Sequence, residues 1–212
     1  MNKGCFITFE GIDGSGKSTQ ISLLEKKLRD AGYDVLLTRE PGGTEIGEKI
    51  RSIILDPSNE EMDQMTEAYL YASSRAQLVR QVIVPAVNEG RIVICDRFVD
   101  SSIAYQAYGR QMGETIELLN SFAVGECLPD ISFLLRIEPE NTRSRMEGRE
   151  LDRIEMASDD FHYRTFLGYD QIAAANPDRV VVIDGRDSVE HIHELIMTNL
   201  QRFDAFDSLI NK

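Results

Sequence analysis

Residues 11–18 read GIDGSGKS and have the spacing G-x-x-x-x-G-K-S of a phosphate-binding loop. The glycines let the backbone curl so that successive N–H groups point inward at phosphate oxygens. Lys17 would bridge the β- and γ-phosphates of a nucleoside triphosphate, and the Ser18 hydroxyl would ligate Mg²⁺. A glycine-rich turn with a capping serine would explain neither the lysine nor the spacing. The loop therefore predicts a nucleoside triphosphate site formed by Gly11, Ile12, Asp13, Gly14, Ser15, Gly16, Lys17, Ser18 and Thr19.

A second polar group follows the apolar run RIVICD at residues 91–96. Asp96 would end a buried strand at the carboxyl edge of a sheet, where α/β proteins place their ligands. A carboxylate there can hold the magnesium shell, and the adjacent Arg97 can clamp a phosphate. A salt bridge at the strand end is the alternative interpretation, and the Asp-Arg pair alone does not decide between the two.

The elements that would position these residues alternate along the chain. Five short apolar runs, rich in β-branched residues, are typical of parallel strands covered on both faces, and segments of helical periodicity separate them. The fold class is therefore predicted to be α/β, a doubly wound parallel sheet with helices on both faces. Pro85 lies inside one helical segment and should kink or end it. The predicted strands are 5–10, 34–38, 91–96, 131–137 and 179–184, and the helices are 17–31, 44–55, 66–88, 114–124, 159–175 and 188–206.

Length and charge restrict the partners that can be expected. The chain has 212 residues and a formal net charge of −13, so its overall field repels nucleic acid and anionic membrane surfaces. No apolar stretch approaches membrane-spanning length, and the first residues, MNKGCFITFEG, do not resemble a signal peptide. The three scattered cysteines are typical of reduced thiols in a cytoplasmic protein. We expect one domain spanning residues 1–212.

The sequence argues against two classes of nucleotide-binding protein, signalling GTPases and motors. The chain has no N-K-x-D run to read guanine, which argues against a signalling GTPase, and it is short and acidic for a motor. A compact kinase for a small acceptor remains, as does a binding module that uses ATP only as a switch.

The motifs together resemble the thymidylate kinase family. FEGIDGSGKST, TREPGGTEIGEKIRSIIL, YASSRAQL, DRFVDSSIAYQ, LDRIE and VVVIDG occur in family order over nearly the whole chain. The resemblance implies phosphorylation of dTMP to dTDP with ATP and Mg²⁺, in dTTP synthesis. It also implies a three-layer P-loop kinase fold with a central five-stranded parallel sheet and a short lid, and a homodimer. A P-loop kinase for another small acceptor is the alternative.

The resemblance assigns the acceptor site residue by residue. Tyr71 would stack on thymine and Arg75, one helical turn later, would hydrogen-bond the base, although an aromatic at such a position is more often part of a core. Asp13 would lie near the sugar and the metal, or simply form a turn before Gly14. By similarity the remaining acceptor residues are Arg39, Arg51, Arg97, Ser102, Tyr105 and Gln106, and Phe98 stands where the family often has Tyr or His.

The segment 142–155, TRSRMEGRELDRIE, departs from the apolar rhythm of the chain. On charge pattern alone it is a solvated surface, because acidic residues alternate with the arginines. The phosphate loop, however, contains no arginine, and phosphoryl transfer needs cationic stabilisation of the γ-phosphoryl oxygens. The chain resembles bacterial-type family members that supply this cation from a lid. Arg149 and Arg153 are the leading candidates, with Arg143 and Arg145 behind them.

Overall fold

The computed structural model describes residues 4–142, 150–203 and 206. Its centre is a five-stranded sheet in which every pairing is parallel and the strand order is β2-β3-β1-β4-β5. The strands are β1 (Cys5–Glu10), β2 (Val35–Arg39), β3 (Ile92–Asp96), β4 (Ile131–Arg136) and β5 (Val180–Asp184). All five predicted strands are confirmed, with bounds that shift by one residue at most. The P-loop kinase fold class is confirmed with them.

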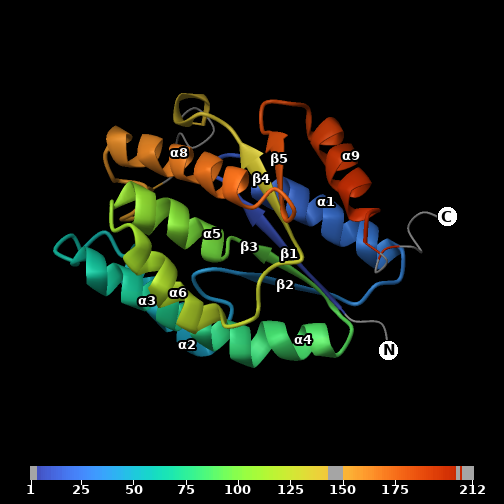
Figure 1. Ribbon diagram of the computed structural model, residues 1–212, viewed down its shortest axis with the longest axis horizontal. Coiled ribbons are helices and arrows are strands. Elements are labelled where there is room, and N and C mark those ends of the chain that lie inside the picture. The colour runs from blue at the N-terminus through green and yellow to red at the C-terminus, as the bar shows by residue number, and fades with distance from the viewer. Residues whose placement is uncertain (1–3, 143–149, 204–205, 207–212) are drawn as a thin grey trace.

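Side chains along β1 point alternately to the two faces of the sheet, and each face has its own core cluster. Ile7 and Phe9 point to one face, against α1 (Lys17–Asp30) and α9 (Val189–Leu200). Phe6, one residue out of phase, points to the opposite face and packs with side chains of α3 and α4. Figure 1 shows α1 beside α9, and α2, α3, α4 and α6 gathered on another side of the sheet. The other α-helices of more than five residues in the described part of the chain are α2 (Glu45–Leu55), α3 (Gln64–Leu78), α6 (Glu114–Val124) and α8 (Asp159–Ala175).

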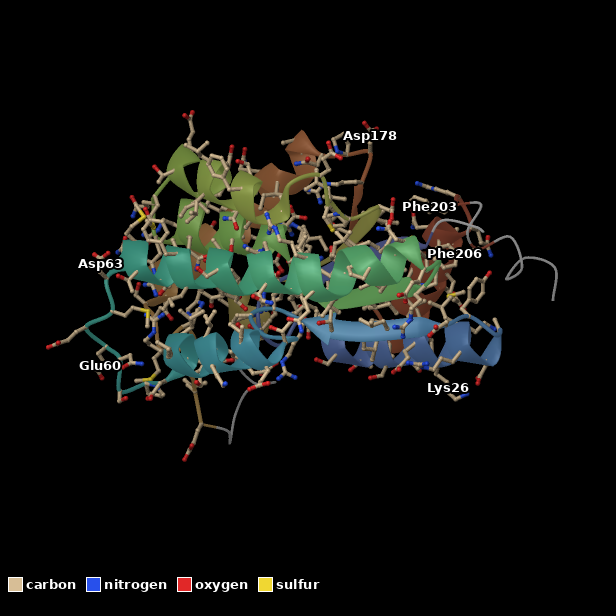
Figure 2. The ribbon with its side chains drawn as sticks, turned by 90° about the horizontal axis from the view of Figure 1, so that it is seen from below. Lys26, Glu60, Asp63, Asp178, Phe203 and Phe206 are labelled. Carbon is tan, nitrogen blue, oxygen red and sulfur yellow. The ribbon has the colours of Figure 1, made fainter. Side chains whose placement is uncertain are left out.

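The helix predicted at residues 66–88 does not end at Pro85. Asp63 caps α3 at its start, and a π-helical stretch, η1 (Val79–Ile83), joins α3 to α4 (Val84–Asn88). The N–H of Val84 reaches back to the carbonyl of Val79, and Pro85 lies in the first turn of α4, where its missing N–H costs little. The wider π turn therefore carries the chain past the proline, and Figure 2 shows one continuous ribbon from Asp63 onward.

Two further differences concern helix positions. α5 (Val99–Ser102) continues as a second π-helical stretch, η2 (Ile103–Gly109), which the sequence pattern did not predict. Helix α9 ends at Leu200, six residues earlier than expected. Phe206 nevertheless lies in the core, with its ring centroid 5.8 Å from that of Tyr33 (Figure 2). None of the helices described has the length and apolarity needed to cross a bilayer.

Candidate active site

One cavity of about 590 Å³ opens at the carboxyl edge of the sheet, as the sequence predicted. Its lining combines residues of the phosphate loop with residues of α2, α3 and η2. Most of the predicted site residues meet here, namely Asp13, Gly14, Ser15, Gly16, Lys17, Ser18, Thr19, Arg39, Arg51, Tyr71, Arg75, Asp96, Arg97, Ser102, Tyr105 and Gln106. Gly11, Ile12 and Arg153 are not part of the lining, and Arg149 falls outside the described residues.

The phosphate loop has the backbone that the glycines predict. Gly11, Gly14 and Gly16 all have positive φ angles, of 130°, 76° and 102°. A Cβ added at Gly11 would lie 2.6 Å from the carbonyl oxygen of Leu135, so a side chain would not fit. Lys17 is buried and its Nζ donates to the carbonyls of Gly11 and Ile12, each at 3.0 Å. Burial, followed by the charge of Arg97, lowers the pKa of Lys17 to about 8.

Arg97 connects this loop to the acceptor side. Its two terminal nitrogens donate to the Gly11 carbonyl and to Asp13 Oδ1, both at 2.8 Å, and its guanidinium lies 5.1 Å from the ring centroid of Tyr105. The Tyr105 hydroxyl donates to the second oxygen of Asp13 at 3.2 Å. Burial alone would raise the pKa of Asp13, but Arg97 and Lys17 outweigh burial and hold that pKa well below its usual range. Asp13 is therefore an ionised anchor of Arg97 and more than a turn former.

Arg75 is the most completely bonded side chain of the acceptor region and is 1% exposed. Its Nε and one terminal nitrogen donate to Glu40, and that same nitrogen donates to the Phe98 carbonyl. The other terminal nitrogen donates to Ser102 Oγ and Asn120 Oδ1. All five N–H groups of Arg75 thus donate to protein atoms, so none of them is free to bind a base. Any base contact would have to replace one of these bonds.

Other predicted acceptor residues are also fixed by neighbours. Tyr71, one turn before Arg75, is partly exposed and lines the cavity. Arg51 donates to the Pro41 carbonyl at 2.8 Å. Arg39 is exposed and pairs with Glu48 at 2.9 Å. These positions are compatible with the predicted roles but assign none of them.

Glu67 links the acceptor pocket to the charged segment. This carboxylate is 1% exposed and accepts from Gln106 Nε2 at 3.1 Å, from Arg110 at 3.0 Å and from Arg153 at 2.7 Å. Arg153 also donates from Nε to the carbonyl of Ile54 at 2.7 Å. Its guanidinium is therefore turned toward α2 and α3 in this structure, and its role as a lid cation stays a prediction. Residues 150–153 are not helical.

The magnesium residues proposed from sequence lie at the same cavity. Ser18 is exposed in the first turn of α1, while Asp96 ends β3. Asp96 Oδ1 is buried and has no hydrogen-bond partner in the described part of the chain. Within those residues no group of three or more His, Cys, Asp or Glu side chains is arranged to hold a metal ion. One carboxylate, Asp96, and one hydroxyl, Ser18, suit Mg²⁺, which is usually held by one or two carboxylates together with phosphate oxygens and water.

Sequence reasoning missed three buried residues that organise this site: Glu10, Glu67 and Asn120. Glu10 could have been found by the rule that selected Asp96, because it too is an acid that ends an apolar run at the carboxyl edge of the sheet. Glu67 and Asn120 lie on helices among other polar residues, and no local pattern distinguishes them.

Comparison with known proteins agrees with this geometry. The family model for thymidylate kinase matches residues 9–196. A thymidylate kinase from Exiguobacterium sp. is 48% identical over 196 residues, covering 92% of each chain, and one from Thermoanaerobacter sp. is 47% identical over 202 residues, covering 95% of this chain and 99% of the other. The solved thymidylate kinase of Ehrlichia chaffeensis is 34% identical, with a TM-score of 0.78 over 94% of this chain and 99% of its own. The chain therefore belongs to the thymidylate kinase family, ATP-dependent phosphotransferases that act on dTMP.

Proposed function

We propose that this cavity carries out transfer of the γ-phosphoryl group of ATP to dTMP, with Mg²⁺ as cofactor, and so supplies dTDP for dTTP synthesis. One observation carries the proposal: a single cavity is lined both by the phosphate loop and by the acceptor residues around Tyr71 and Arg97. Phosphoryl transfer needs donor and acceptor aligned at close range, and a shared cavity provides that alignment.

The donor end consists of the phosphate loop and the start of α1. The loop N–H groups and the helix N-terminus bind the phosphates, while Lys17 exchanges its carbonyl partners for phosphate oxygens. Mg²⁺, held by Ser18 and Asp96, would neutralise charge on the donor phosphates. The buried Asp96 oxygen without a protein partner supports this assignment.

The acceptor end consists of side chains that hold the nucleoside and its phosphate. Tyr71 stacks on the thymine, and Tyr105 and Gln106 border the sugar and base. Arg97, kept in place by Asp13, contacts the phosphate that attacks. Arg75 fixes the polar wall of the pocket, and Arg51 and Arg39 lie at its margin. Because Arg153 is tied to Glu67, we assign the lid cation to Arg149 in the first place.

We also propose a homodimer, in line with the family resemblance. Helices α3 and α6 together expose large apolar side chains, with Tyr69, Leu118 and Phe122 at 56%, 63% and 72% exposure. Apolar residues clustered at that level are typical of protein–protein contacts. Light scattering of the wild-type chain and of Phe122→Glu measures this directly, with a dimer expected for the first and a monomer for the second.

We further infer a cytoplasmic location. No disulfide joins the cysteines at positions 5, 95 and 127 in the described part of the chain, and thiols of this kind are typical of a reducing compartment.

Turnover with a panel of acceptors tests the reaction. dTMP, dUMP, dCMP and dAMP are compared at fixed ATP and Mg²⁺, with EDTA as the metal control. We expect dTMP to have the highest kcat/KM and EDTA to abolish turnover. Faster turnover of another nucleotide would reassign the acceptor, and ATP binding without turnover of any acceptor would indicate a switch protein.

A further inference from the structure

The backbone of Arg97 is in an unusual conformation. Its φ angle is 66°, in the left-handed region that non-glycine residues avoid. Such a conformation persists only where surrounding groups impose it. The Arg97 N–H donates to the carbonyl of Phe9 at 2.9 Å, and the next N–H, of Phe98, donates to Glu10 Oε1 at 2.8 Å. The last two residues of β1 thus hold the peptide groups on both sides of Arg97.

The second carboxylate oxygen of Glu10 acts on the guanidinium side. Oε2 accepts from Ser101 Oγ at 2.6 Å, and Ser101 Oγ in turn accepts from Arg97 at 3.3 Å. The hydroxyl of Tyr169 lies 2.8 Å from the same Ser101 oxygen and donates to Glu10 at 3.4 Å. One carboxylate therefore supports both the backbone that follows Arg97 and the hydroxyl beside its guanidinium.

Glu10 does not itself meet the substrates. It is 1% exposed and is not part of the cavity lining. A carboxylate is costly to bury, and the adjacent Phe9 belongs to the apolar core, so packing alone gives no reason for a carboxylate here. Burial, with a contribution from Asp100, raises the pKa of Glu10 to about 8 against the opposing effects of Ser101 and Arg97, so its role is tested above pH 8, where Glu10 is a carboxylate.

We propose that Glu10 is a positioning residue for phosphoryl transfer, whose carboxylate fixes Arg97 through the Phe98 amide and the Ser101 hydroxyl. The inference rests on the proposed contact between Arg97 and the acceptor phosphate. It identifies a function for the Glu in the FEG run that begins the phosphate loop.

A double-mutant cycle tests the proposal, with kcat for dTMP phosphorylation as the readout. Glu10→Gln keeps the shape of the side chain but replaces one acceptor oxygen with an NH₂ group. We expect Glu10→Gln to lower kcat by about tenfold or more in the wild-type background while the KM for ATP changes by less than about twofold. In an Arg97→Ala background the same substitution should cost less than about twofold, because a residue that acts through another has no separate effect once its target is gone. Equal losses in both backgrounds would overturn the proposal.

Asp130→Asn is the matched control. Asp130 Oδ2 accepts from the N–H of Phe6 at 2.8 Å, so it is a carboxylate bonded to the far end of the same strand. The Asp130→Asn substitution should leave kcat unchanged both in the wild-type and in the Arg97→Ala background. If Glu10→Gln does not fold, Ser101→Ala takes its place in the cycle, because it removes the partner of Oε2 and leaves the Phe98 bond intact.

Amide hydrogen exchange separates this proposal from the assigned reaction. The Phe98 N–H should exchange faster in Glu10→Gln than in the wild type and should be unchanged in Asp130→Asn. Unaltered exchange in Glu10→Gln would overturn the positioning role. If the exchange result held but the wild-type chain did not phosphorylate dTMP, the error would lie in the assigned reaction and the link from Glu10 to Arg97 would stand.

Discussion

Arg153→Ala distinguishes two roles for this arginine. In the structure it is an anchor that binds Glu67, whereas the sequence predicts a cation that stabilises the transition state. The side chain makes two charge-assisted hydrogen bonds, to Glu67 and to the carbonyl of Ile54, both at 2.7 Å. The ion pair is buried, with side-chain exposures of 9% and 1%, so solvent screening weakens it little. We therefore expect the substitution to destabilise the fold as well as to alter the site.

The expected loss follows from these contacts. A hydrogen bond to a charged group contributes about 1.5–3 kcal/mol, and Glu67 keeps Arg110 and Gln106 as partners, which limits the penalty of an unpaired carboxylate. Two such bonds give about 3–6 kcal/mol, and a total near the lower end, about 3 kcal/mol, is expected. For a chain of this length that loss lowers Tm by about 6–12 °C. Because Glu67 also holds Gln106, the KM for dTMP should rise.

Thermal unfolding and single-turnover dTDP formation measure the two effects separately. Combining Arg153→Ala with Glu67→Gln should give a smaller loss of stability than the sum of the single losses, because both changes remove one interaction. At saturating ATP and dTMP the single-turnover rate of Arg153→Ala should fall by less than about tenfold, or 1.4 kcal/mol. An unchanged Tm together with a rate loss of about a hundredfold or more, at constant KM for dTMP, would refute the anchor interpretation. Arg153 would then act as the clamp.

Three further predictions concern the remaining parts of the site. Lys17→Ala should abolish phosphoryl transfer and leave the circular dichroism spectrum unchanged, because within the described residues the Lys17 ammonium bonds two loop carbonyls; near wild-type turnover would contradict the phosphate-loop assignment. Tyr71→Ala should raise the KM for dTMP far more than that for ATP, by about 1–3 kcal/mol of lost stacking, and an equal rise in both would make Tyr71 a core residue. Burial raises the pKa of Glu40 from 4.5 to about 7. The contribution of protonated Glu40 to the free energy of unfolding is therefore complete below pH 4.5 and is lost as the pH rises through 7. Urea unfolding should show a loss of about 3 kcal/mol from this group that is absent in Glu40→Gln, and parallel pH profiles for the two proteins would refute it.

The sheet could be predicted from sequence because its signals are local. The inner strands β3, β1 and β4 are apolar runs buried along nearly their whole length, as expected for strands covered on both faces, whereas the edge strands β2 and β5 are only partly buried. Strand β1 has the predicted bounds. The two π-helical stretches could not be predicted, because they leave no such local signal in the sequence. A π turn adds a residue to the helical repeat, and nothing in the periodicity around Pro85 indicates that addition.

The acceptor site could be predicted only in part because its contacts are distant in sequence. Arg75 pairs with Glu40, 35 positions away, and with Asn120, 45 positions away. Glu10 and Ser101 are 91 positions apart. A motif gives the type of a residue and its place at the edge of the sheet, but it does not say which buried group holds that residue still. Arg153 shows the consequence: its motif was identified, whereas its partner Glu67 was not.

The pairing of cations explains how a chain of net charge −13 can hold two anionic nucleotides. Arg97 is paired with Asp13, Arg75 with Glu40 and Arg153 with Glu67. Each carboxylate fixes the direction of its guanidinium, so little reorganisation is needed when charge develops during transfer. Lys17 differs, since its Nζ donates to two backbone carbonyls and forms no ion pair with a carboxylate of the described residues. We infer a division of labour in which the arginines provide geometry and Lys17 provides the charge that follows the phosphoryl group.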